Sequence, residues 1–111
     1  MDLDTIKQSL SGYLSDKKRP SAFLLFYYGR HTSGKYKFRN LDELLTAILD
    51  AYEMGLDEAE GEYTAFAKID GRWHELCTRE EDGTLTFDHY VMDEDSTQWM
   101  QRVYRQAEKT W

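Results

Sequence analysis

The dipeptide Asp70-Gly71 constrains the fold more than any other feature of the sequence. Aspartate followed by glycine favours the two consecutive positive-φ positions of a tight turn that joins antiparallel strands. Runs rich in β-branched and aromatic residues flank it, at 63–69 (YTAFAKI) and 72–79 (RWHELCTR). The sequence therefore predicts a β-hairpin, and because a two-residue turn fixes the pairing, it also predicts the register.

This register sorts the side chains of the hairpin and of the following strand onto two faces. The expected pairs are Ile69 with Arg72, Lys68 with Trp73, Phe66 with Glu75, Ala65 with Leu76 and, if Asp82-Gly83 is a second tight turn, Leu76 with His89 and Glu75 with Tyr90. The first face should carry Tyr63, Ala65, Ala67, Ile69, His74, Leu76, Leu85, Phe87, His89 and Val91. The second should carry Phe66, Lys68, Trp73, Glu75, Cys77, Asp88 and Tyr90. Because the first face is the more apolar, we expect it to meet the helices, although a one-residue slip would exchange the two.

Apolar residues recur at helical spacing in three segments. These are residues 3–16, residues 41–54 and a C-terminal segment that begins after Asp93, Asp95 or Ser96 and runs to Trp111. Asn40 should cap the middle helix, with Glu43 three residues later as in a capping box.

The remaining segments predict strands. Residues 21–28 (SAFLLFYY) are apolar on both faces, which is typical of an interior strand. A turn cluster and the alternating segment 35–39 (KYKFR) follow and predict a second hairpin, and residues 84–92 (TLTFDHYVM) supply the last strand. The predicted fold is one α+β domain over residues 1–111, a mainly antiparallel sheet of about five strands with three helices, in the order α-β-β-α-β-β-β-α.

The formal net charge of −7 is unevenly distributed along the chain. Residues 1–40 hold eight Lys and Arg against three Asp and Glu, whereas residues 41–111 hold six against eighteen. Such a split can mean two interaction surfaces of opposite sign, or folding can bring the halves together and mix the charges. The acidic runs 57–62, 80–82 and 93–95 could imitate nucleic-acid phosphates, but runs of this kind are more often solvated loops.

The second hairpin is the candidate nucleic-acid contact. Its basic residues Arg30, Lys35, Lys37 and Arg39 stand among aromatic residues, a faint likeness to the aromatic-basic strands of RNA-binding sheets. The segment lacks the glycines of that pattern, and an acidic chain with a pI near 4.9 repels a polyanion everywhere else. We therefore expect a solvated edge strand whose basic residues oppose aggregation, and we keep nucleic-acid binding as an alternative.

No pattern of catalytic, cofactor-binding or metal-binding residues stands out. His74 and His89 share a predicted face, but we expect no third metal ligand beside them, so a partly buried histidine pair is the simpler interpretation. Cys77 should lie on the opposite face from both histidines, which argues against an activated thiol nucleophile. Residues 29–35 (GRHTSGK) are followed by a strand and not by a helix, unlike a phosphate-binding loop.

These observations favour a non-enzymatic function, that of a small acidic adaptor, inhibitor or immunity-type protein that occupies a partner's surface. We expect the partner to be another protein or a second copy of this chain. The partner-binding residues should be Phe66, Lys68, Trp73, Glu75 and Tyr90, because large aromatics around a few charges are typical of an interface centre. The alternative for this face is that the first or the last helix covers it within the monomer. A nucleic-acid-binding module and an enzyme of a type that spacing does not reveal are the other two function classes.

The cysteine content and the hydropathy of the chain limit the cellular compartments in which we expect the protein. The single cysteine, Cys77, excludes an internal disulfide, and the start MDLDTIKQ lacks the basic and apolar parts of a signal peptide. The longest apolar run, residues 22–29, is far too short to cross a bilayer. We expect a cytoplasmic protein without a membrane partner.

Overall fold

The computed structural model describes residues 3–14, 20–28, 33–48, 62–79, 85–87 and 89–109. The hairpin at Asp70-Gly71 is present as predicted, with φ values of 53° and 80° at the two residues. It joins β3 (Glu62–Ile69) to β4 (Arg72–Arg79). The predicted pairs Ile69–Arg72, Lys68–Trp73 and Phe66–Glu75 are confirmed.

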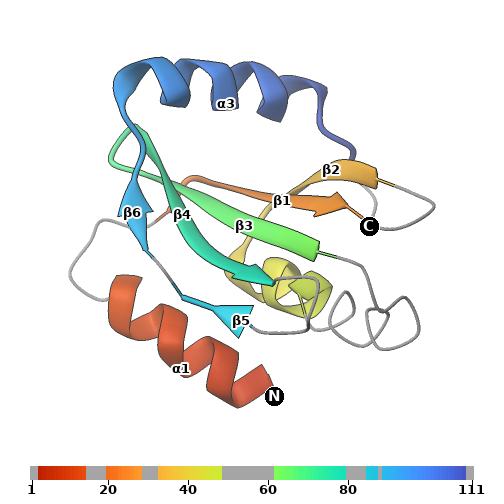
Figure 1. Ribbon diagram of the computed structural model, residues 1–111, viewed down its shortest axis with the longest axis vertical. Helices are drawn as coiled ribbons and strands as arrows, with labels where there is room; N and C mark the ends of the chain where they lie inside the picture. The colour runs from red at the N-terminus through yellow and green to blue at the C-terminus, as the bar shows by residue number, and fades with distance from the viewer. Residues whose placement is uncertain are drawn as a thin grey trace.

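β3 and β4 belong to an antiparallel sheet whose other strands are β1 (Ala22–Tyr28), β2 (Ser33–Phe38), β5 (Leu85–Thr86) and β6 (Tyr90–Val91). The order is β2-β1-β3-β4-β5, and β6 also pairs with β4 (Figure 1). β1 is an interior strand, as predicted, with β2 and β3 as its neighbours. The single strand predicted over residues 84–92 is two short pieces, β5 and β6, but the predicted pair Glu75–Tyr90 is present.

Three helices complete the predicted order α-β-β-α-β-β-β-α: α1 (Leu3–Leu14), a helix over residues 41–48, and α3 (Glu94–Gln106). Asn40 caps the middle helix, since its Oδ1 accepts from the backbone N–H of Glu43 at 2.9 Å. The Asp93 side chain caps α3 in the same way through Ser96. The parts of the predicted segments at 15–16, 49–54 and 110–111 lie outside the described residues. No helix in the described part of the chain is long and apolar enough to cross a membrane.

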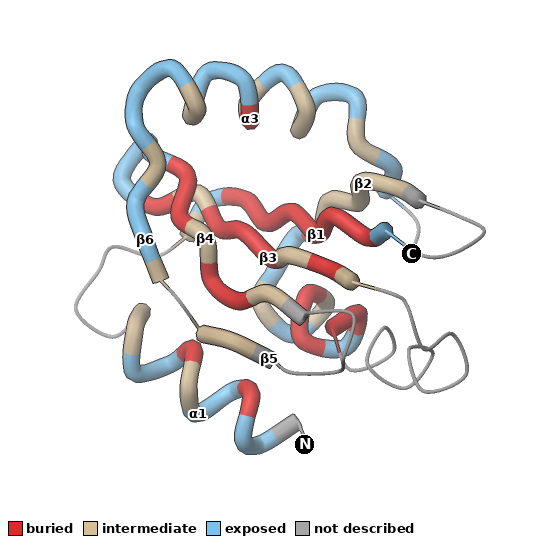
Figure 2. The backbone as a smooth tube through the Cα atoms, in the orientation of Figure 1, coloured by how far each residue is buried: buried red, intermediate tan, exposed pale blue. Residues whose placement is uncertain are grey.

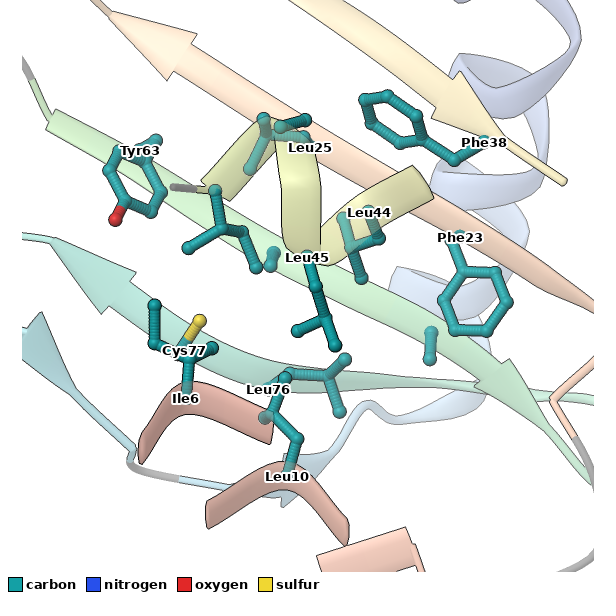
Figure 3. Close-up of a cluster of buried hydrophobic side chains, with 14 of the residues drawn as sticks. Ile6, Leu10, Phe23, Leu25, Phe38, Leu44, Leu45, Tyr63, Leu76 and Cys77 are labelled. Carbon is teal, nitrogen blue, oxygen red and sulfur yellow. The ribbon is translucent and has the colours of Figure 1, made fainter. Parts of the chain in front are cut away.

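The helices cover the two faces of the sheet unequally. α1 and the helix over residues 41–48 lie on one face, and α3 lies on the other (Figure 1). The first core contains Ile6, Leu10, Phe23, Leu25, Leu44, Leu45, Ile48, Tyr63, Leu76 and Cys77 among others (Figure 3). The second, smaller core contains Ala22, Leu24, Phe26, Phe66, Trp73 and Met100. The central strands are therefore buried on both faces for most of their length, as Figure 2 shows.

A β-bulge changes the register beyond Phe66. The pairing shifts between Ala65 and Phe66, so that Ala65 lies opposite Cys77 and not opposite Leu76 as predicted. The extra residue on β4 lets Leu76 and Cys77 both join the first core, where both are fully buried (Figure 3). The prediction that Cys77 lies on the second face, away from the histidines, is therefore wrong. A turn sets the register only up to the first irregularity in the ladder.

Both edges of the sheet are protected from adding another strand. On β2, the backbone N–H of Lys37 donates to the carbonyl of Glu108 at 2.8 Å, and the N–H of Glu108 donates to the carbonyl of Lys35 at 2.9 Å. The segment after α3 thus pairs with an edge that we expected to be solvated. At the other edge, the interruption between Thr86 and Tyr90 leaves only two-residue strands. Short or covered edges of this kind disfavour edge-to-edge association.

We predict that Leu45→Ala destabilises the protein by about 2–5 kcal/mol, because the leucine side chain is 1 % exposed and its removal leaves a cavity in the first core. Urea unfolding followed by circular dichroism gives the free energy. Thr46→Ala, on the exposed side of the same helix, is the control and should change stability by less than about 1 kcal/mol. An unchanged midpoint for Leu45→Ala would show that this helix does not pack as described.

Candidate functional site

The two largest residues of the predicted partner-binding set are in the second core. Trp73 is fully buried and Phe66 is 5 % exposed. The Trp73 ring lies 5.7 Å from the ring of Tyr104 on α3, and its backbone N–H donates to Thr97 at 3.3 Å. The expected exposure of these two aromatics is therefore wrong, and the alternative, a covering helix, is what the structure has. α3 has an apolar stripe, and packing against this face of the sheet buries that stripe together with the two aromatics.

The other three residues of that set reach the surface. The Lys68 ammonium donates to Gln101 on α3 at 2.8 Å. Tyr90 and Glu75 face each other across β6 and β4, with the phenol oxygen 3.5 Å from the carboxylate. Partial burial raises the pKa of Tyr90, and the negative charge of Glu75 adds to this shift. Tyr90 is 50 % exposed, so this pair is available to a partner.

α3 is too narrow to cover the whole second face. A helix is about 10 Å wide, whereas the eight residues of β3 span about 26 Å. α3 crosses the sheet near the Asp70-Gly71 turn, where it contacts Lys68 and Trp73, and Trp99 extends from its side to the ring of Phe26 at 6.1 Å. The part of the face farther from the turn lies beyond α3.

We call the residues of this uncovered part, together with the exposed aromatics beside it, the open sheet surface. Its members are Tyr28 on β1, Thr64 on β3, Glu75 and Thr78 on β4, Tyr90 on β6 and Trp99 on α3. Tyr28 and Trp99 are 43 % and 46 % exposed. The two threonines between the aromatics are joined by a hydroxyl–hydroxyl hydrogen bond of 3.2 Å, which ties β3 to β4 on this face. Tyr28, Tyr90 and Trp99 are thus the exposed large aromatics beside this part of the sheet.

Sequence reasoning missed Tyr28 and Trp99. Tyr28 is two residues after Phe26 on β1, so the two side chains lie on the same face of the sheet. The apolar sequence of this strand does not indicate that it extends beyond the part of the face that α3 covers. Trp99 precedes the buried Met100 by one position, which places it about 100° around the helix, at the flank of the stripe. Its flanking position is the one signal in the sequence that could have identified it.

The described basic residues of the second hairpin all have partners within the protein. The Lys35 ammonium lies 5.5 Å from the centre of the Phe26 ring. The Lys37 ammonium donates to the carbonyl of Tyr104 at 3.2 Å and lies 5.0 Å from the centre of its ring. Arg30, the fourth residue of the predicted nucleic-acid contact, lies outside the described residues, as does His31.

The remaining member, Arg39, is bound to a carboxylate. Its guanidinium donates to Glu43 at 3.1 Å and its backbone N–H donates to the same carboxylate at 3.2 Å. These two hydrogen bonds lower the pKa of Glu43. The capping-box glutamate therefore reaches the residue before the cap and not the cap itself. Lys35, Lys37 and Arg39 do not form a patch of cations that await phosphates.

Lys37 and Arg39 instead border a hollow that we call the groove. It has a volume of about 960 Å³ and lies between the end of β2, the helix over residues 41–48 and the segment after α3. It is lined by Lys37, Phe38, Arg39, Asp42, Glu43, Thr46, Ala47, Tyr104 and Lys109.

A tyrosine lies against both predicted face-sharing histidines. The Tyr13 hydroxyl on α1 is 2.6 Å from Nδ1 of His74, a side chain only 6 % exposed. The Tyr13 ring also stacks on His89, with the centroids 4.1 Å apart and the planes at 17°. Burial raises the pKa of Tyr13, so its hydroxyl is protonated at neutral pH. The cluster fastens the last turn of α1 to the sheet, and no group of three or more His, Cys, Asp or Glu that could hold a metal exists among the described residues.

No family model, no curated protein and no solved structure matches the chain.

We predict that Trp73→Ala destabilises the protein by about 3–5 kcal/mol, the usual cost of removing a large buried aromatic. Tyr90→Ala on the same face should cost less than about 1.5 kcal/mol, because its side chain is half exposed. Chemical denaturation of both variants provides the comparison. Equal, small effects would mean that α3 does not cover Trp73.

We further predict that Cys77 does not react with a thiol reagent in the folded protein at pH 8. Burial raises the pKa of its thiol to about 12, so almost no thiolate is present, and the sulfur is inaccessible. Colour development with an aromatic disulfide reagent should therefore follow the fraction unfolded across a urea titration. Rapid labelling without urea would contradict both the burial and the shifted register of β4.

Proposed function

We propose that the protein is a non-enzymatic binding protein, an adaptor, inhibitor or immunity-type molecule, that occupies a partner protein through the open sheet surface. The observation that carries the proposal is the exposure of Trp99, Tyr28 and Tyr90, at 46 %, 43 % and 50 %, beside the second face of the sheet. Scattered exposed aromatics need no explanation, but a gathering of them marks an interaction site in monomeric proteins.

The chemistry of this surface suits a protein partner. Tryptophan and tyrosine are the residues most enriched at energetic centres of interfaces, since they bury a large area and lose little conformational entropy. Threonine hydroxyls at Thr64 and Thr78 offer hydrogen bonds, and Glu75 offers one charge that can orient a partner. The surface retains Glu75 and Tyr90 from the residues expected on sequence grounds and replaces Phe66 and Trp73 by Tyr28 and Trp99.

Nucleic-acid binding is less well supported. Each described cation of the second hairpin already contacts a ring, a carbonyl or a carboxylate. Two carboxylates, Asp42 and Glu43, stand in the groove beside Lys37 and Arg39, where a phosphate backbone would have to pass. A chain of net charge −7 adds a general repulsion. The proposed setting is the cytoplasm, in keeping with one cysteine that is buried as a thiol.

The test is capture of a partner from an extract of the cells that make the protein, with the immobilised chain as bait. We expect one protein to bind in a stoichiometric amount, and we expect Trp99→Ser and Tyr28→Ser each to remove it, because truncating a central aromatic anchor costs more than about 2 kcal/mol of binding. Thermal unfolding of each variant ensures that lost binding is not lost folding.

Val91→Ser is the matched control. Val91 is 47 % exposed and apolar, but it is opposite His74 in the register and therefore on the other face of the sheet. Capture that survives Val91→Ser and is lost with the two surface variants supports the proposal. No stoichiometric partner, or capture that is indifferent to Trp99 and Tyr28, would overturn it.

A further inference from the structure

The outer edge of β2 is paired with a short piece of the protein's own chain, the segment after α3 (Figure 1). The backbone N–H of Lys37 donates to the carbonyl of Glu108 at 2.8 Å, and the N–H of Glu108 donates to the carbonyl of Lys35 at 2.9 Å. Glu108 thus stands opposite Tyr36 and runs parallel to β2. The structure therefore shows that this edge accepts an extended segment beside it.

The piece that occupies this edge is small. β2 has six residues and spans about 20 Å, whereas the segment after α3, as far as the structure describes it, forms a bridge at Glu108 alone. Two backbone hydrogen bonds hold this bridge. The edge ends at the groove, which leaves space beside Lys37 and Arg39 for a longer segment. A strand that pairs along β2 can therefore replace these two hydrogen bonds by a larger number.

Basic side chains belong to the residues whose backbone groups point outward from this edge. The carbonyl of Lys35 and the N–H of Lys37 both point away from β1, and Arg39 follows two residues later. The ammonium groups of Lys35 and Lys37 lie on the face of the sheet that α3 covers, 5.5 Å from the Phe26 ring and 5.0 Å from the Tyr104 ring. No ion pair within the described part of the chain involves either lysine.

A second copy of β2 does not suit this edge. In an antiparallel pair of two β2 edges, any register that pairs both lysines places a basic residue of one copy opposite a basic residue of the other. Like charges directly opposite each other destabilise a strand pair, and lysines on an edge strand are a common protection against self-association. Acidic side chains at the same positions would instead be attracted to Lys35 and Lys37.

The protein's own segment does not use this attraction. Glu108 is opposite Tyr36, and Tyr36 packs against the first core, on the other face of the sheet from the two lysine ammonium groups. The side chain of a strand residue that lies between two acidic ones would stand beside Tyr36, where an apolar group is favoured.

We propose that the edge of β2 is a binding site for an extended segment of a partner protein, in which acidic and apolar residues alternate. The acidic side chains face Lys35 and Lys37, and the apolar side chain between them lies beside Tyr36. Glu108 occupies the edge in the absence of the partner and is displaced when the partner binds. The proposal does not depend on the function proposed above, because it uses none of the residues of the open sheet surface.

The probe is a fluorescently labelled, blocked octapeptide of alternating glutamate and valine, titrated into the full chain at low salt. Glu108→Pro should bind it at least about tenfold more tightly than the unaltered protein, since proline lacks the N–H that donates to Lys35. Ala107 already has φ −67° and ψ 149°, a conformation that suits a residue before proline, so this variant should fold. Glu108→Ala keeps the backbone donor and is the matched control, with a change of less than about twofold.

Three further comparisons separate strand pairing from simple charge attraction. In the Glu108→Pro chain, Lys35→Gln combined with Lys37→Gln should weaken binding by about tenfold or more, whereas Arg102→Gln on the exposed side of α3 should change it by less than about twofold. The octapeptide with lysine in place of glutamate should not bind. A glutamate peptide with N-methylated valines, which cannot donate to β2, should bind at least about tenfold more weakly.

Hydrogen exchange in the unaltered protein tests the displacement without any variant. The N–H of Lys37, which is bonded to Glu108, should exchange at least about tenfold faster than the N–H of Tyr36, which pairs with Leu25 inside the sheet. Equal protection of these two amides would overturn the proposal. Equal affinity of the glutamate peptide for the unaltered, Glu108→Pro and Glu108→Ala chains would overturn it as well, as would equal binding of the glutamate and lysine peptides.

Discussion

The packing of α3 against Trp73 decides which surfaces the rest of the molecule can offer. It converts the most aromatic part of the second sheet face into core, with Trp73 and Met100 both fully buried. Because the helix crosses the strands near the Asp70-Gly71 turn, the far part of the same face remains uncovered. The same helix brings Tyr104 to Lys37 and so builds one wall of the groove. Both candidate sites thus follow from the placement of one amphipathic helix.

Two ion pairs among the described residues join the basic and the acidic parts of the chain. Arg39 and Lys7 belong to the basic part of the chain, and they pair with Glu43 and Asp42 of the acidic part. Exposed pairs of this kind contribute little to stability, but they remove the basic patch that a nucleic acid would need. The net charge of −7 is a sum over the whole chain, and it does not give the charge of any one surface.

The sequence predicts those parts of the fold that depend on neighbouring residues. The turn at Asp70-Gly71, the cap at Asn40 and the stripe of α1 are local, and all are confirmed. The bulge that brings Cys77 into the first core is not local, because it depends on what the opposite strand and the helices need to bury. The hydrophobic stripe of α3 shows that the helix is covered on one side, but not which face of the sheet covers it.

The candidate sites were harder to predict for the same reason. Glu75 and Tyr90 face each other as predicted, although β5 pairs with β4 one residue away from the register that a two-residue turn at Asp82-Gly83 would give. Trp99 lies 6.1 Å from the Phe26 ring on β1 only because of where α3 packs on the sheet, which no spacing in the sequence indicates. The groove joins residues 37–47 to Tyr104 and Lys109, segments more than fifty positions apart in the chain. The candidate sites depend on tertiary placement, whereas the order of the helices and strands depends on local sequence.

The central claim, that α3 covers Trp73 and leaves Trp99 at an open surface, can be tested by the effect of a soluble paramagnetic agent on the indole N–H signals in the NMR spectrum. Single Trp→Phe replacements assign the signals. The account predicts that the paramagnetic agent increases the relaxation rate of the buried Trp73 indole N–H only slightly. It predicts a several-fold larger increase for the half-exposed Trp99 indole N–H. Equal enhancement at the two, or a larger one at Trp73, would contradict it, because α3 would then not lie where both the second core and the open sheet surface require it.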